Sequence, residues 1–431
     1  MILSENIPNG ITILEDKLKK TALSCAMALL FTAASYAIET PYFSGCAGFM
    51  ATLANEKNSD DFSPEFNADN FFSGQLDFSG KLLLRCDLYL QAGDLFDSTI
   101  FDSETNPNNA KFRIEELSGT YTINGESTNH YISLYRGRYE PIGSDIFLQR
   151  QFGIPEISSQ ITKSWHGLSG SSIYPFYATG LSYVMHPDAN FAVGLYVYKN
   201  QATTSLDLSE STDSFNWDLR YAAVMRRATF DLAAGFTCPL NNDTSDAFAI
   251  KEIQLHWGIN ALLGNVNTTT LFIQAGINKI TIDKDDDTDT LNKNDLYFVI
   301  EPRLATKYGN LNITAFNIPY LSARDMIYLR HLVNMNNPDA KCVTGANITL
   351  CSNNLYIGST NFTGGIHATF TISECDFDDF DFSNEKDLCI TPYAYLDLFG
   401  GALEASATVN VTKLDDIKNA ISARVGFQTT F

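Results

Sequence analysis

The last eleven residues of the chain, 421–431, constrain its fold more than any other segment. Apolar and polar side chains alternate there, so the two kinds fall on opposite faces of an extended strand. The apolar face holds Ile421, Ala423, Val425, Phe427 and Phe431, and the polar face holds Ser422, Arg424, Gln428 and Thr430. This pattern, ending on an aromatic residue, is typical of the closing strand of a membrane β-barrel, which separates lipid from a wet lumen. An edge strand of a soluble β-sandwich is the alternative interpretation.

The N-terminal region has the features of a secretory signal peptide. Lys17, Lys19 and Lys20 precede an apolar run over residues 22–34, and Ser35 and Ala37 place small residues at the positions that determine cleavage. We therefore predict that residues 1–37 are a signal peptide. Residues 38–70 are predicted to form an N-terminal periplasmic or poorly ordered segment, and residues 71–431 the outer-membrane barrel.

Alternating strands recur along the mature chain. Over residues 75–91, most apolar side chains take one face and most polar side chains the other, and the segment is predicted to form one long two-faced strand. Residues 215–225 and 230–236 predict a hairpin with a tight turn near Arg227, and further turns are predicted at Gly264 and Gly309. No segment after residue 37 approaches the roughly 18 uninterrupted apolar residues of a membrane-spanning helix. The pattern therefore predicts an all-β chain that crosses the membrane with strands.

The connections between these strands are alternately short and long. The long ones are acidic, as in residues 282–294 and 376–386, and would form the extracellular end of the barrel. At roughly 20 to 25 residues per strand with its loop, the chain predicts an antiparallel barrel of about 16 strands, with 14 to 18 as the range. Pro302 and Pro392 depart from the strand pattern, because proline cannot donate to a sheet ladder.

Charge and cysteine content narrow the function classes. A net charge of −21 argues against a nucleic-acid partner. Acidic loops are either simply solvated or hold divalent cations that bridge lipopolysaccharide. No CxxC pair or HExxH motif is present, so we expect no metal centre and no cofactor. In an oxidising periplasm, disulfides are predicted for Cys342 with Cys351 and for Cys375 with Cys389, which leaves Cys46, Cys86 and Cys238.

One stretch resembles a known family. Residues 135–147 (YRGRYEPIGSDIF), followed by residues 171–198, are similar to the carbohydrate-selective porin family, OprB, in the order of a glycine-plus-basic element, an irregular segment, a tyrosine-proline element and a hairpin. The resemblance covers roughly residues 70–200 and, more loosely, the C-terminal strand. It implies a 16-stranded porin that passes small sugars through a constriction lined by arginines and acidic residues. The many cysteines and the acidic loops depart from that pattern.

Candidate pore residues come from the resemblance and from strand parity. The resemblance assigns the basic element to Arg136, Arg138 and Glu140. Parity places charged side chains on the lumen face, where they remain solvated. These are Lys81, Arg85, Asp87, Arg220, Arg303 and Lys307, with Tyr89 and Tyr135 as aromatic surfaces for sugar rings. Residues 149–170 lack clean alternation and are the candidate for an inward loop. Exchanging Arg136 and Arg138 for alanine is expected to widen the pore.

Three functions fit these patterns. The first is a non-enzymatic porin in a Gram-negative outer membrane that passes small hydrophilic solutes such as sugars. Such a porin would contact lipid and lipopolysaccharide, and the sequence is compatible with a homotrimer. The second is a barrel hydrolase, which needs a nucleophile or an activated water at one rim, although no Ser/His/carboxylate spacing stands out. The third is a surface adhesin that uses the long loops.

Overall fold

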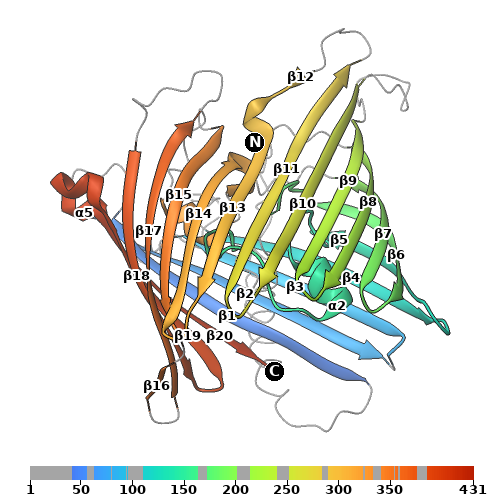
Figure 1. The fold of residues 1–431 in the computed structure, drawn as a ribbon, viewed down its shortest axis with the longest axis horizontal. Helices are drawn as coiled ribbons and strands as arrows, with labels where there is room; N and C mark the ends of the chain where they lie inside the picture. Colours follow the sequence, from blue (N-terminus) through green and yellow to red (C-terminus); the bar gives the residue numbers. More distant parts are fainter. Residues whose placement is uncertain are drawn as a thin grey trace, which may run out of the picture.

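The fold is a closed antiparallel β-barrel of 18 strands, seen in a computed structural model of the chain (Figure 1). The structure describes residues 41–55, 63–78, 80–93, 95, 110–163, 172–200, 214–239, 252–283, 290–323, 326–332, 341–353, 355–357, 360–375 and 386–431. The predicted signal peptide lies outside these residues. The strand count is the upper end of the predicted range.

Each barrel strand pairs with its neighbours along the chain. The strands are β1 (Tyr42–Asn55), β2 (Pro64–Phe78), β3 (Leu82–Ala92), β4 (Ala110–Asn124), β5 (Asn129–Gly137), β6 (Ala178–Asp188), β7 (Phe191–Asn200), β8 (Ser214–Met225), β9 (Ala228–Pro239), β10 (Glu252–Asn265), β11 (Thr269–Asp283), β13 (Leu296–Ala305), β14 (Gly309–Pro319), β15 (Cys342–Ser352), β17 (Thr360–Cys375), β18 (Lys386–Leu398), β19 (Gly401–Asn410) and β20 (Ile421–Thr430). Two short strands, β12 (Thr290–Leu291) and β16 (Leu355–Ile357), pair antiparallel with β11 and β17.

The remaining elements are short helices in the connections. They are α2 (Ile146–Phe152), η1 (Gln160–Thr162), η2 (Lys293–Asp295), α3 (Tyr320–Ala323), α4 (Ile327–Leu332), η3 (Val411–Asp416) and α5 (Ile417–Ala420). None of the helices in the described part of the chain has the length and apolarity needed to cross a membrane.

The C-terminal strand closes the barrel, as its alternation predicts. β20 pairs with β19 on one side and with β1 on the other, from Cys46 opposite Thr430 to Leu53 opposite Ala423. The chain end is fixed as well: Gly45 and Phe431 exchange two backbone hydrogen bonds of 3.0 Å, and the Phe431 ring stacks on Phe43. Because no strand edge remains open, a two-sheet sandwich is excluded.

Two strand boundaries differ from the sequence predictions. Residues 75–91 form the β2–β3 hairpin and not one strand, with Gly80 in the turn at a φ of 67°. The sequence pattern hides this turn because the apolar residues keep the same parity before and after it. The Asp77 side chain stabilises the turn by accepting a hydrogen bond from the Gly80 amide at 2.8 Å. The barrel also begins at Tyr42, inside the segment predicted to precede it, because the small residues of β1 obscure its pattern.

The polarity of the wall is inverted relative to a soluble protein. Large apolar side chains such as Leu134, which is 67% exposed, Leu219 and Trp257 cover the outside. Polar side chains such as His256, Gln274 and Asn347 are buried on the inside. This arrangement is the one required of strands that cross a membrane around a polar interior.

The two strand prolines are accommodated where pairing is interrupted. Pro302 lies between the paired residues Ile300 and Arg303, and no partner on β14 is matched to it. Pro392 likewise lies in a gap of the β18–β19 register, between Ile390 and Tyr393. Each proline therefore lacks its N–H donor at a position where the ladder does not use it.

Neither predicted disulfide is present. Cys342 and Cys351 stand at opposite ends of β15, and nine residues of strand span roughly 30 Å, far beyond the reach of a disulfide. Cys351 and Cys389 are free thiols. The short sequence spacing suggested proximity, but an extended strand separates the first pair.

Candidate functional site

The connection between β5 and β6 folds into the barrel. The chain leaves β5 at Gly137, with a φ of 109°, and turns inward at Glu140, whose φ of 49° is rare for a residue with a side chain. The buried Glu140 carboxylate accepts a 2.5 Å hydrogen bond from Tyr196 Oη and contacts Arg150 at 3.4 Å. These contacts hold a strained backbone at the point where the segment leaves the wall.

A short helix, α2, follows this turn. Asp145 precedes it, and its Oδ2 accepts hydrogen bonds from the amides of Ile157 (3.0 Å) and Ser158 (2.8 Å), so that it fixes the chain after the helix. Asn260 on β10 donates to Asp145 Oδ1 at 2.8 Å. Burial raises the pKa of Asp145, although its hydrogen bonds act in the opposite direction. Gly153 ends the helix in the left-handed conformation, with a φ of 64°.

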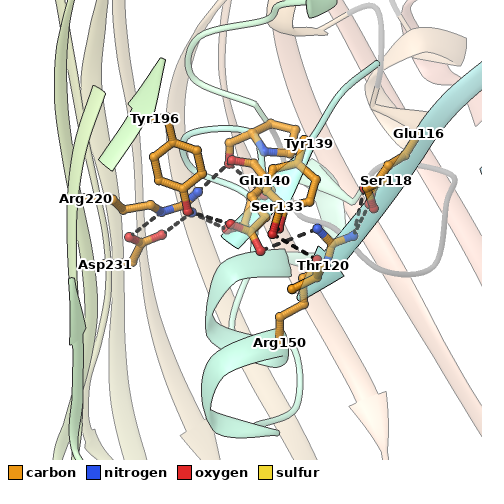
Figure 2. Close-up of polar contacts among 12 residues, drawn as sticks. Glu116, Ser118, Thr120, Ser133, Tyr139, Glu140, Arg150, Tyr196, Arg220 and Asp231 are labelled. Atoms are coloured by element: carbon orange, nitrogen blue, oxygen red, sulfur yellow. Dashed lines mark hydrogen bonds and ion pairs between the residues drawn. The ribbon is translucent and has the colours of Figure 1, made fainter. Parts of the chain in front are cut away.

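Arg150 ties α2 to the barrel wall at β4. Its Nη2 donates to both carboxylate oxygens of Glu116, at 2.9 and 2.7 Å, and its guanidinium lies over the Tyr139 ring at 5.0 Å (Figure 2). Burial alone would lower the pKa of Arg150, but Glu116 and Glu140 outweigh it and raise the pKa. Arg150 therefore carries a positive charge at every physiological pH. This charge compensates the carboxylates of Glu116 and Glu140, which are buried away from water.

Arg220 on β8 holds the other side of the turn. It forms an ion pair with Asp231 on β9, and its Nη1 donates to the Glu140 carbonyl at 2.6 Å (Figure 2). Its Nη2 also reaches the Ser144 carbonyl at 3.4 Å, and the guanidinium lies 4.6 Å above the Phe147 ring. This fully buried arginine therefore fastens the backbone of the inward segment to two wall strands.

The far end of the segment is fixed at β13. Arg303 donates to the Ile157 carbonyl at 2.8 Å and to Glu301 at 2.7 Å. Glu301 also accepts hydrogen bonds from Ser159 and from Thr314 on β14. The segment thus crosses the inside of the wall from β4 to β13.

A second connection, between β14 and β15, also enters the lumen. The Ile327 amide at the start of α4 donates to the Lys163 carbonyl at 3.1 Å, joining the two segments. Tyr328 hydrogen bonds with Thr369 at 2.8 Å, and Arg424 on β20 donates to the Ile327 carbonyl at 3.3 Å. We call residues 138–163, 320–323 and 326–332 together the lumen belt, because they connect β4 with β17 and β20 across the interior.

The segment returns to the wall beside a buried histidine. Tyr174 stacks on His256 with ring centroids 4.0 Å apart, and His256 Nε2 lies 2.8 Å from Asp218. Thr237 lies near the other ring nitrogen at 3.5 Å but donates its hydroxyl proton to Asn216. This hydroxyl, imidazole and carboxylate set resembles a hydrolytic triad in composition only, because it is buried beneath Tyr174 and its hydroxyl is engaged.

The structure places the predicted pore residues in three locations. Arg138 and Glu140 lie in the lumen belt, and Arg85, Asp87, Tyr89, Tyr135, Arg220 and Arg303 lie on the inner face of the wall. Arg136 is exposed on the face of β5 that carries Leu134, which points away from the lumen. Lys81 and Lys307 are exposed at the end of the barrel that carries the short turns.

Arg85 and Asp87 belong to one charged cluster. Asp87 on β3 is directly paired with Glu116 on β4, which binds Arg150. The Nε of Arg85 and the Oδ1 of Asp87 have no hydrogen-bond partner among the described residues. Tyr89 is held instead by a 2.7 Å hydrogen bond to Asp69. The cluster therefore combines a satisfied ion pair with buried polar atoms that have no hydrogen-bond partner among the described residues.

Several residues of the site were not singled out from the sequence. Asp231 follows the inward parity of β9, so parity contained the signal that would have found it. Glu116 points inward because the β3–β4 register shifts between Asp87 and Leu88, and the parity of the exposed Phe112 and Ile114 would place it outside. Arg150 and Asp145 lie in an irregular segment without any period, and only the folded chain shows their contacts. Among the described residues, no group of three or more His, Cys, Asp or Glu side chains is arranged to hold a metal ion.

No protein-family model matches the chain, and no curated protein is similar to it in sequence. Solved structures with a similar course of the chain include a mutant of the Rh. blastica porin, at 10% identity and a TM-score of 0.44, covering 90% of this chain and 99% of that one. Another is Acinetobacter baumannii OccAB3, at 11% identity and a TM-score of 0.48, covering 90% of this chain and 98% of that one. The function proposed below rests on the residues of this chain.

Proposed function

We propose that this chain is a passive diffusion porin of a Gram-negative outer membrane. The observation that carries this proposal is a closed barrel with an apolar exterior and a polar interior, narrowed by an internal belt held by buried ion pairs. A diffusion channel needs a polar path of fixed width, and rigid lumen segments supply one. The end with short turns then faces the periplasm.

The constriction lies, on this proposal, between the lumen belt and the inner face of β3 and β4. Arg85 is partly exposed, and Asp87 and Glu116 lie beside it, so opposite charges line the same stretch of wall. Closely spaced opposite charges order water and favour hydrophilic solutes that exchange hydrogen bonds. Small carbohydrates are the finer solute class that we propose, since their hydroxyl groups can exchange hydrogen bonds with closely spaced charged groups.

Conductance and swelling measurements test this proposal. Purified protein in a planar bilayer is expected to give stable open channels, and liposomes that contain it should swell in mono- and disaccharides at rates that fall with solute size. A folded barrel without conductance would contradict the porin function. Channels that conduct ions but exclude every sugar would contradict only the carbohydrate class.

Replacing Arg85 with alanine is expected to shift the channel toward cations. A unit charge at about 4 Å in water contributes about 1 kcal/mol, so the cation-to-anion permeability ratio should rise on the order of fivefold. The reversal potential under a salt gradient measures this ratio. Arg136→Ala is the matched control, because Arg136 lies on the outer face and its removal should leave the ratio unchanged. Equal effects of the two substitutions would remove Arg85 from the constriction.

A further inference from the structure

The turns at the short-turn end differ in polarity around the rim. From β2 to β9 their tips are polar or charged and include Lys81, Glu126, Asn190 and Arg227. From β10 to β19 every turn presents an exposed apolar or aromatic side chain. These are Val266 (69% exposed), Tyr308 (77%), Tyr356 (74%) and Phe399 (93%), which we call the apolar rim. The two halves of the rim therefore differ in whether their turns expose a large apolar or aromatic side chain at the tip.

Phe399 shows this most clearly. It occupies the first position of a two-residue turn at a φ of 53°, and Gly400 follows at 74°. Such a turn favours asparagine or glycine, and a bulky side chain in this conformation is an outlier. The ring is almost fully exposed, so no contact within the chain compensates for the strain or for the hydration of the ring. Burial of the ring against a surface outside the chain would offset the cost of hydrating it.

The apolar rim continues the outer wall of the barrel. Leu304 and Leu350 are exposed on the outer face of the strands that lead to Tyr308 and Tyr356. The ammonium group of Lys307 lies 4.6 Å above the Tyr308 ring, which pairs a cation with an aromatic surface at this boundary. Figure 1 shows β16 projecting at the lower edge, beside the turn between β19 and β18. Tyrosine, phenylalanine and lysine at the end of an apolar wall match the headgroup region of a bilayer.

We propose that the apolar rim inserts into the headgroup boundary of the phospholipid leaflet at the short-turn end. The polar tips on the opposite side then remain in water, so the barrel is anchored on one side and tilted toward it. This inference rests on the proposed membrane location. It predicts that the two halves of the rim differ in their access to lipid, although both consist of turns at the same end of the barrel.

Tryptophan fluorescence tests this inference. In a background with Trp165, Trp217 and Trp257 replaced by phenylalanine, single tryptophans are placed by Phe399→Trp on the apolar rim and by Glu126→Trp on the polar side. The full-length protein is inserted into phosphatidylethanolamine and phosphatidylglycerol vesicles, with part of the lipid brominated near the top of the acyl chains. Tryptophan at 399 is expected to be quenched strongly by bromolipid and weakly by aqueous acrylamide, and tryptophan at 126 the reverse.

A protein that keeps only Trp217, which is exposed on the outer wall, separates the two proposals. Bromolipid quenching of Trp217 establishes that the barrel is inserted. If Trp217 is quenched while the tryptophan at 399 responds only to acrylamide, the apolar rim faces water and the anchor is refuted. If Trp217 itself is not quenched, the membrane location fails and the anchor fails with it. Tyr308→Trp provides a second position on the same side and is expected to behave like Phe399→Trp.

Discussion

Replacing Arg150 with alanine is expected to enlarge the channel and make its current unsteady. Arg150 bridges α2 to Glu116 on β4, and it also contacts Glu140. Its removal leaves two carboxylates buried without their cation, and breaking such a pair typically costs about 3–5 kcal/mol. The barrel retains its strand pairing, so the cost falls on the docking of α2 within the lumen. Single-channel recording should show a larger mean conductance and frequent transitions between levels.

Two further variants make this prediction specific. Arg150→Lys retains the charge but not the two-oxygen contact with Glu116, so its conductance should lie between those of the original protein and the alanine variant. Arg226→Ala removes an arginine from an exposed turn and should have no effect. A channel of normal conductance and steadiness in Arg150→Ala would show that α2 does not border the solute path.

Replacing Arg220 with methionine is expected to have the largest effect on stability. Asp231 is then left buried without its partner, and the carbonyls of Glu140 and Ser144 lose their donors. A loss of about 3–5 kcal/mol is typical for one member of a buried ion pair. The temperature at which the barrel loses its compact mobility in detergent gels should fall, and conductance should rise as the Glu140 turn is released.

The double variant Arg220→Met with Asp231→Leu separates the two effects. Removing both charges eliminates the uncompensated carboxylate, so most of the thermal stability should return. The Glu140 carbonyl still lacks its donor, so the raised conductance should persist. If the double variant restored conductance together with stability, Arg220 would act only within the wall and would not hold the inward segment.

The outer and inner faces of the wall are predictable from local sequence. Alternation in β8, β10 and β20 assigns Trp217, Trp257 and Val425 to the outside, where the structure places them. The same rule places Arg85, Asp87 and Arg220 inside. This succeeds because side chains of a strand alternate strictly, so each strand fixes its own two faces without reference to the rest of the chain.

Alternation fails where the chain turns or leaves the sheet. It did not separate β2 from β3, because the tight turn between them preserves parity. It also missed β1, because the small residues of that strand differ little in polarity between alternate positions. Alternation within β5 does put Arg136 on the outer face with Leu134, and its assignment to the pore came from the family resemblance alone. The short spacing of Cys342 and Cys351 suggested a disulfide, but sequence distance does not show whether the segment between two cysteines is extended or folded back.

The sequence by itself determined that strands cross the membrane, which side chains face lipid, and that residue 431 ends a closing strand, because each follows from a period of two within single strands. The tertiary structure alone decided what narrows the lumen. Glu140 lies in a loop turn and Arg150 in a short helix 10 residues later, whereas Arg220 lies on a wall strand 80 residues from Glu140. Their contacts depend on the barrel closing around them, since only a buried, low-dielectric interior makes each charge require its particular partner.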